Sequence, residues 1–131
     1  MARNTARPLS PHLTIWKWGP HMTVSILNRV MGVGLATVGT LFFTAWLIAL
    51  GSGKEAYEMV MGYAQGWMGY VVAVGLSFAF FLHLCAGLRH FVMDAGAGFE
   101  LTTNRLWAWG AIIAPILLTA AMWLFISWKL L

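Results

Sequence analysis

The sequence predicts an all-α integral membrane protein with three transmembrane helices and a cytoplasmic N-terminus. Of the 131 residues, 60% are hydrophobic and only 9% are charged, whereas soluble domains carry about 25% charged residues. Eight Lys/Arg and four Asp/Glu are too few to cover the surface of a small soluble domain. A disulfide scaffold is excluded as well, because Cys85 is the single cysteine. The composition therefore excludes an ordinary cytosolic enzyme and a disordered chain.

Three long stretches contain no Asp, Glu, Lys or Arg, namely 30–50, 59–88 and 106–128. About 20 helical residues cross a hydrocarbon core of roughly 30 Å, and the stretches lack the period-two alternation of barrel strands. We therefore expect an N-terminal cytoplasmic segment followed by a three-helix transmembrane domain. The expected segment is 1–24, the domain is 25–131, and the spans cover about 25–50, 62–93 and 106–129.

Short glycine-containing links are expected to join the spans. Gly51 to Glu55 predicts a turn after the first span, and Gly96 and Gly98 lie in the link between the second and third. Pro115 lies inside the third span, where it frees a backbone carbonyl and is expected to kink the helix.

The distribution of positive charge predicts the orientation in the membrane. Six basic residues fall on the N-terminal side, and two, Lys54 and Lys129, on the other. The six are Arg3, Arg7, Lys17, Arg29, Arg89 and Arg105. The positive-inside rule therefore places the N-terminus in the cytoplasm. The net charge of +4 fits this orientation better than nucleic-acid binding. No signal peptide is recognised, and Pro8 and Pro11 prevent the arginine-rich start from forming the amphipathic helix of a transit peptide. We therefore expect a bacterial inner membrane rather than a mitochondrial one.

His83 lies within the second predicted span, where an ionisable side chain normally faces protein or a cofactor. Residues at helical spacing from it are small: Gly75, Ala79 and Gly87. Two interpretations are open. In the first, the small residues let helices pack closely and the histidine forms a hydrogen bond to a neighbouring helix. In the second, they leave room for a flat macrocycle, and the imidazole binds its iron.

His90 shares the face of His83, with Arg89 beside it, and these groups are suited to haem propionates or a quinone carbonyl. Two histidines on one side of one helix cannot bind an iron from both faces. A second axial ligand would come from His12, His21 or another polypeptide, and the proline-punctuated N-terminal segment favours the partner chain. A covalent Cys-x-x-Cys-His haem motif is absent.

Ser25 and Arg29 share a face at the start of the first span, at the same membrane side as Arg89 and His90. A single arginine at this depth is commonly an anchor whose charge reaches the interface. Together, a serine and an arginine can also donate hydrogen bonds to a quinone oxygen. The sequence contains no phosphate-binding loop, nucleophile–base pair or acidic metal cluster, so the chain is not expected to be catalytic alone.

Three motifs resemble the cytochrome b subunit family of succinate dehydrogenase, respiratory complex II, the larger of its two membrane anchors. Arg7 to Leu13 (RPLSPHL) resembles the N-terminal signature, and Ser25 to Gly32 (SILNRVMG) resembles Ser-x-x-His-Arg-x-[Ser/Thr]-Gly. His83 to Asp94 is similar to His-x-x-x-Gly-x-Arg-His-x-x-x-Asp. The chain departs from the pattern at Asn28, where the family usually has His, and at Met31, where Ser or Thr is common.

The resemblance implies that His83 is an axial ligand of haem b, with the other ligand on the smaller anchor subunit of a heterodimeric bundle. It also implies that Arg89 and His90 lie near the haem propionates and that Ser25 and Arg29 line a ubiquinone site. The expected partners are the smaller membrane anchor, the iron–sulfur subunit, the flavoprotein subunit and membrane lipid. The expected function is a non-flavin subunit of succinate:ubiquinone oxidoreductase, in the respiratory chain and citric acid cycle. Two alternatives remain: a non-redox packing or transport subunit, and the anchor of a fumarate reductase.

Overall fold

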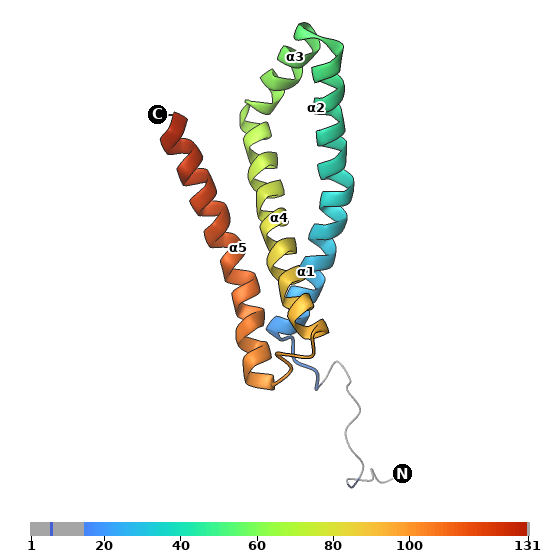
Figure 1. Ribbon diagram of the computed structural model, residues 1–131, viewed down its shortest axis with the longest axis vertical. Coiled ribbons are helices and arrows are strands. Elements are labelled where there is room, and N and C mark those ends of the chain that lie inside the picture. The colour runs from blue at the N-terminus through green and yellow to red at the C-terminus, as the bar shows by residue number, and fades with distance from the viewer. Residues whose placement is uncertain (1–5, 7–14, 131) are drawn as a thin grey trace.

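The structure is a bundle of long helices (Figure 1). The computed structural model describes residue 6 and residues 15–130, so the motif at 7–13, with His12, lies outside the described residues. In the described ranges there is no strand, as the all-α prediction expects. The elements in chain order are α1 (Pro20–Gly34), η1 (Leu35–Gly39), α2 (Thr40–Ser52), α3 (Lys54–Ala64), α4 (Trp67–Asp94) and α5 (Leu101–Leu130).

Three helices are long and apolar enough to cross a membrane, which confirms the predicted number of spans. They are Pro20–Ser52, Trp67–Asp94 and Leu101–Lys129. The first begins before the predicted position because Pro20 has its backbone angle fixed for a first helical turn. The side chain of Thr23 also donates to the Gly19 carbonyl at 3.2 Å, which holds this end of the helix.

The second span begins at Trp67 rather than at 62, because residues 54–64 form a separate helix, α3. The backbone turns between the two helices at Gly66. The end of α3 approaches α4 so closely that a Cβ on Gly69 would lie 2.1 Å from the carbonyl oxygen of Ala64. Only glycine permits this contact. The predicted turn at 51–55 is confined to Gly53, whose φ of 104° favours glycine.

The first span contains a π-helical turn, η1, between α1 and α2. The amide of Thr40 donates to the Leu35 carbonyl, five residues earlier, instead of the usual four. A π turn accommodates one extra residue, so side chains beyond it are rotated relative to a regular helix. Residues of α1 and α2 that regular helical spacing would place on one face therefore do not share a face across η1.

The helix α5 continues through Pro115 without a break, and the proline side chain is buried. Thr119 donates its hydroxyl proton to the Pro115 carbonyl at 2.7 Å. In the link before α5, Gly96 and Gly98 adopt positive φ values of 84° and 78°, as expected for a tight glycine turn.

The helices α1, α4 and α5 meet at one end of the molecule, where α1 and α5 begin and α4 ends (Figure 1). Their shared core is small and consists of Val24, Ala86, Ala108 and Ala111. The sequence provides mostly alanines here, so the helix backbones approach closely. Ile112 of α5 packs against this core and is partly buried.

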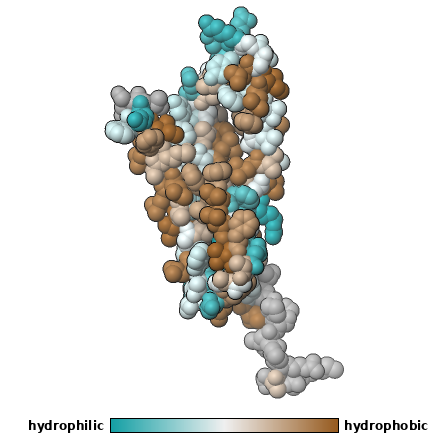
Figure 2. Space-filling view, viewed as in Figure 1, coloured by the Kyte–Doolittle hydropathy of each residue, from teal (hydrophilic) through white to brown (hydrophobic). Residues whose placement is uncertain are grey.

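Little of the apolar surface is buried within the chain itself. In the most apolar window of each span, 6%, 17% and 17% of the residues are buried. Brown, hydrophobic side chains cover the visible face of the middle of the bundle, and the teal, polar groups gather mainly toward its ends (Figure 2). Such a surface requires lipid or neighbouring subunits around it. The chain is a multi-pass membrane protein.

Candidate functional site

The imidazole of His83 lies between α4 and α1. Its Nδ1 is 3.4 Å from the backbone carbonyl oxygen of Asn28, on α1. At 1.5 Å per residue, His83 is about 16 Å along α4 from the helix end at Asp94, and so lies well inside the spanning helix. The side chain is nevertheless exposed in the isolated chain. An exposed imidazole at this depth indicates a surface that something else covers.

Gly32, one helical turn after Asn28, provides the space that the imidazole occupies. A Cβ on Gly32 would lie 3.0 Å from Cε1 and 3.2 Å from Nδ1 of His83. The Asn28 carbonyl and Gly32 therefore form a notch in α1 that receives the edge of the ring. The side-chain oxygen of Asn28 is itself buried and without a hydrogen-bond partner.

The small-residue stripe of α4 is divided in the structure. Ala79 is buried, Gly87 is half-buried and Gly75 is exposed. The space in front of Gly75 and Gly87 is open, because no atom outside their own helix turns lies within 4 Å of a Cβ built there. Ala79 thus packs within the bundle, whereas Gly75 and Gly87, the outer part of the stripe, border open space.

Arg89 lies on another side of α4, toward α5. Its Nη2 donates to Oδ1 of Asn104 at 2.5 Å, the residue is only 8% exposed, and its Nε has no partner. The amide of Asn104 also points to the sulfur of Met93 at 4.0 Å. The structure therefore joins Arg89 to α5 and not to His83. Asn104 was not predicted as a functional residue, because its position in a presumed link gave no signal of this pairing.

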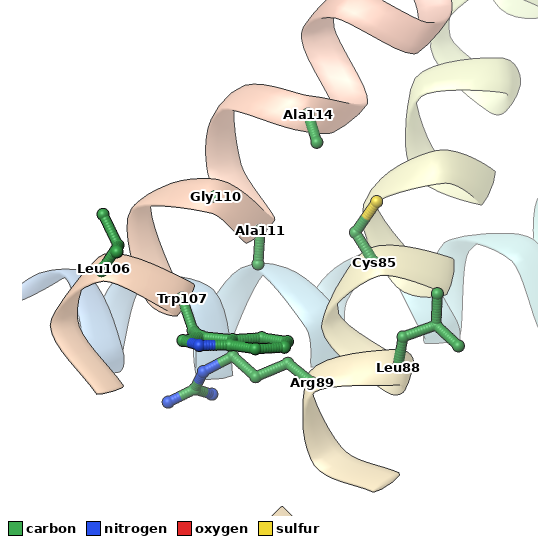
Figure 3. Close-up of a pocket in the computed structure, with 8 residues that line it drawn as sticks. All are labelled: Cys85, Leu88, Arg89, Leu106, Trp107, Gly110, Ala111 and Ala114. Atoms are coloured by element: carbon green, nitrogen blue, oxygen red, sulfur yellow. The ribbon is translucent and has the colours of Figure 1, made fainter. Parts of the chain in front are cut away.

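A shallow groove of about 400 Å³ lies between α4 and α5 (Figure 3). Arg89 and Trp107 lie at one end of it, and Cys85 and Ala114 lie farther along. His83 is not among the lining residues. The groove is accordingly separate from the notch that holds the imidazole.

Ser25, Arg29 and His90 lie at the end of the bundle where α1 begins and α4 ends (Figure 1). Ser25 is half-buried, while Arg29 and His90 are exposed. None of the three makes a side-chain hydrogen bond or ion pair with another described residue. Their polar groups are therefore available to a bound molecule or a neighbouring subunit at this end.

Within residues 15–130, no group of three or more His, Cys, Asp or Glu side chains could hold a metal ion. A single imidazole supplies one ligand. An iron bound to His83 would thus have to arrive with most of its own ligands, as it does in a macrocycle. His21, a candidate second ligand, is exposed in the first turn of α1, about 10 Å along that helix from Asn28.

Comparison with known proteins gives a consistent result. Residues 3–125 match the family model of the succinate dehydrogenase/fumarate reductase transmembrane subunit. A succinate dehydrogenase cytochrome b556 subunit of Rickettsia felis is 35% identical over 117 residues, which are 89% of this chain and 90% of the relative. The Paracoccus denitrificans cytochrome b556 subunit is 36% identical over 95 residues, 72% of each chain.

The mitochondrial succinate dehydrogenase cytochrome b560 subunit of Sus scrofa is 33% identical over 108 residues. These cover 82% of this chain and 63% of the relative. The expected family resemblance is confirmed by both the family model and these relatives. The chain therefore belongs to the family of succinate dehydrogenase and fumarate reductase transmembrane subunits, and it is a cytochrome b subunit of succinate dehydrogenase.

Proposed function

We propose that this subunit binds haem b through His83 and forms part of a ubiquinone-reduction site at the cytoplasmic edge of a bacterial inner membrane. The observation that carries the proposal is the exposed imidazole inside the spanning helix α4, with Nδ1 turned to α1. The flavoprotein, the iron–sulfur subunit and the smaller membrane anchor would complete the enzyme. Electrons from succinate would reach quinone through cofactors of those partners.

The described residues fit haem b in three respects. His83 is a nitrogen donor with Nε2 free of protein hydrogen bonds, the outer part of its small-residue stripe is open, and the neighbouring Asn28 carries an orphaned buried oxygen. Bound haem would store one electron within the membrane. The contribution of this chain is to hold the imidazole, exclude water and keep the surroundings apolar.

The second axial ligand is proposed to come from the smaller anchor. His83 already packs against α1, so the opposite face of a bound macrocycle would be turned away from this helix. His21 lies in the first turn of that same α1. The exposed apolar surface of the spans also offers the area that a second anchor would cover.

The polar groups at the cytoplasmic end are assigned by charge and exposure. Ser25 and Arg29 would donate hydrogen bonds to a quinone carbonyl oxygen, since both lack partners in the described chain. His90 and Arg89 would lie near the haem propionates. Arg89 could do so while its Nη2 still bonds Asn104, because its Nε has no hydrogen-bond partner.

A difference spectrum tests the haem assignment. The purified complex, reduced with dithionite and compared with the oxidised form, should show a b-type α-band. His83→Gln should lose most of that band, because an amide is a poor iron ligand. The matched variant His21→Gln should retain it, because His21 is an exposed histidine in the first turn of α1 and the second ligand is proposed to come from the smaller anchor. A wild-type complex without the band would refute haem binding.

One contact favours a second candidate function. The 3.4 Å approach of His83 to the Asn28 carbonyl is also what a helix-bridging histidine would make. In a non-redox packing subunit, His83→Gln would preserve assembly and the purified wild-type complex would show no b-type α-band. The same spectrum, read together with the yield of assembled complex, separates the two functions.

A further inference from the structure

We propose that the notch formed by Gly32 and the Asn28 carbonyl sets the tautomer and the orientation of the His83 imidazole. The proposal rests on the haem function proposed above and deepens it. Gly32 and Asn28 would be positioning residues, since both would act on the haem through His83.

The tautomer follows from the chemistry of the contact. A backbone carbonyl oxygen can only accept a hydrogen bond, so Nδ1 must carry the proton when it bonds Asn28. In the neutral ring, Nε2 then has the lone pair, which is the form that binds iron. Ligating histidines generally donate their second ring proton to a carbonyl or carboxylate, which fixes the ring and raises its basicity. Here the donor and acceptor come from two different spanning helices.

The orientation follows from the missing side chain of Gly32. The ring edge carrying Nδ1 and Cε1 occupies the volume that a Cβ would need, at 3.2 and 3.0 Å. An added methyl group must therefore displace either the ring or α1. Val24 of α1 is buried in the shared core, whereas His83 is exposed on its other side. The ring will move, and the helix will stay.

Gly32→Ala is therefore a specific test. The replacement favours helix by roughly 1 kcal/mol, so α1 should form at least as well as in the wild type. Gly34→Ala is the matched control, because it makes the same change on the same helix and its Cβ would meet no atom within 4 Å. Both variants are made in the complete membrane complex, and both are studied with the ferric haem bound.

Electron paramagnetic resonance provides the readout, because the largest g value of low-spin ferric haem depends on the orientation of the axial imidazole planes. Gly32→Ala should shift this g value and the haem midpoint potential, while Gly34→Ala should leave both at wild-type values. Unchanged values in a haem-containing Gly32→Ala complex would overturn the positioning role alone. A wild-type complex without b-type haem would overturn this inference and the proposed function together.

A second measurement decides the matter if Gly32→Ala does not assemble. Electron–nuclear double resonance on the wild-type complex, labelled with 15N-histidine and exchanged into D₂O, reports the exchangeable proton on Nδ1 of the axial ligands. An exchangeable proton on Nδ1 of the axial ligand that maps to His83 supports the proposed hydrogen bond to the Asn28 carbonyl. An axial ligand with a deprotonated Nδ1 that maps to His83 would overturn it.

Discussion

A histidine inside a membrane-spanning helix is unfavourable unless its polar atoms are satisfied. In this chain His83 satisfies one nitrogen with the Asn28 carbonyl and leaves the other without a hydrogen bond to protein. The open nitrogen is the one that we propose binds haem iron, and Gly32 provides the room that lets the ring lie in this way. The chemistry of the site thus depends on one imidazole and on a glycine of another helix.

At the end of the bundle where α1 begins, Arg29 is predicted to be needed for quinone reduction. Hydrogen bonds to charged groups contribute about 1.5–3 kcal/mol. Arg29→Ala should therefore lower kcat/KM for ubiquinone by about 10- to 100-fold. Reduction of an artificial acceptor by the flavoprotein and iron–sulfur subunits should stay at the wild-type rate.

Arg105→Ala is the control for this prediction, since Arg105 is also exposed and lies near the same end of the bundle, on α5. It should leave both activities unchanged. Equal quinone activity in Arg29→Ala and Arg105→Ala would show that Arg29 only anchors the helix at the interface.

The sequence made His83 a candidate ligand, because a histidine inside an apolar run stands out chemically, and its role stays a prediction. The sequence was not sufficient to pair His83 with Gly32, or Arg89 with Asn104, because these contacts depend on how α1 and α5 are rotated against α4. Helical spacing along the second predicted span was the only reason to place His90 and Arg89 near His83. The structure shows Arg89 bonded to α5 instead, and its predicted place near haem propionates stays a prediction.

At the scale of the elements, the bond from Arg89 to Asn104 is predicted to hold α4 against α5. A double-mutant cycle with Arg89→Met and Asn104→Leu should give a coupling energy of about 1.5–3 kcal/mol, the range for hydrogen bonds to charged groups. The measurement is reversible unfolding of the complex in mixed detergent and SDS micelles. Additive effects of the two substitutions would contradict the pairing.

The π-helical turn leads to a prediction about deletions. Removing the exposed Val38 from η1 should convert the turn into regular α-helix, and the faces of α1 and α2 should keep their relation to each other. The complex should therefore assemble with wild-type haem content, as measured by absorbance per mole of flavin.

Deletion of Val30 is the matched control, because it removes another exposed valine, this time from the regular helix α1. It rotates the preceding residues by about 100° relative to Gly32 and so disrupts the notch with Asn28. Haem content should fall sharply. Equal haem content in the two deletion variants would show that η1 does not accommodate the extra residue of the first span.

Long apolar runs made the three spans predictable, whereas their ends depended on local contacts. The start at Pro20 and the separate helix α3 follow from a proline first turn and from the approach of Ala64 to Gly69. The π turn was not predictable, because residues 35–39 have an apolar pattern that is equally compatible with α-helix.

At the scale of the whole molecule, the chain is incomplete as a packed unit. Its shared core contains one valine and three alanines, while large apolar side chains face outward along every span. Lipid tails can cover such a surface, but they cannot hydrogen-bond the exposed imidazole of His83. The composition alone indicated the membrane, but it did not indicate which polar groups the fold leaves exposed.

The orientation of the complete bundle is the last prediction. The end at which α1 begins carries the majority of the basic residues, and the opposite end carries Lys54 and Lys129. The positive-inside rule thus places the link between α4 and α5 in the cytoplasm and the turn between α2 and α3 outside. Both segments have exposed positions, at Ala97 and Lys54 respectively, where a label can be attached.

Cys85 is the single cysteine, so Cys85→Ala gives a background without thiols on which Lys54→Cys or Ala97→Cys can be introduced. A membrane-impermeant maleimide should label Lys54→Cys in intact spheroplasts and Ala97→Cys only in inside-out vesicles. The background variant controls for labelling of other subunits. The reverse pattern would place Ser25 and Arg29 on the outer side, and the quinone site would then lie away from a cytoplasmic flavoprotein and iron–sulfur subunit.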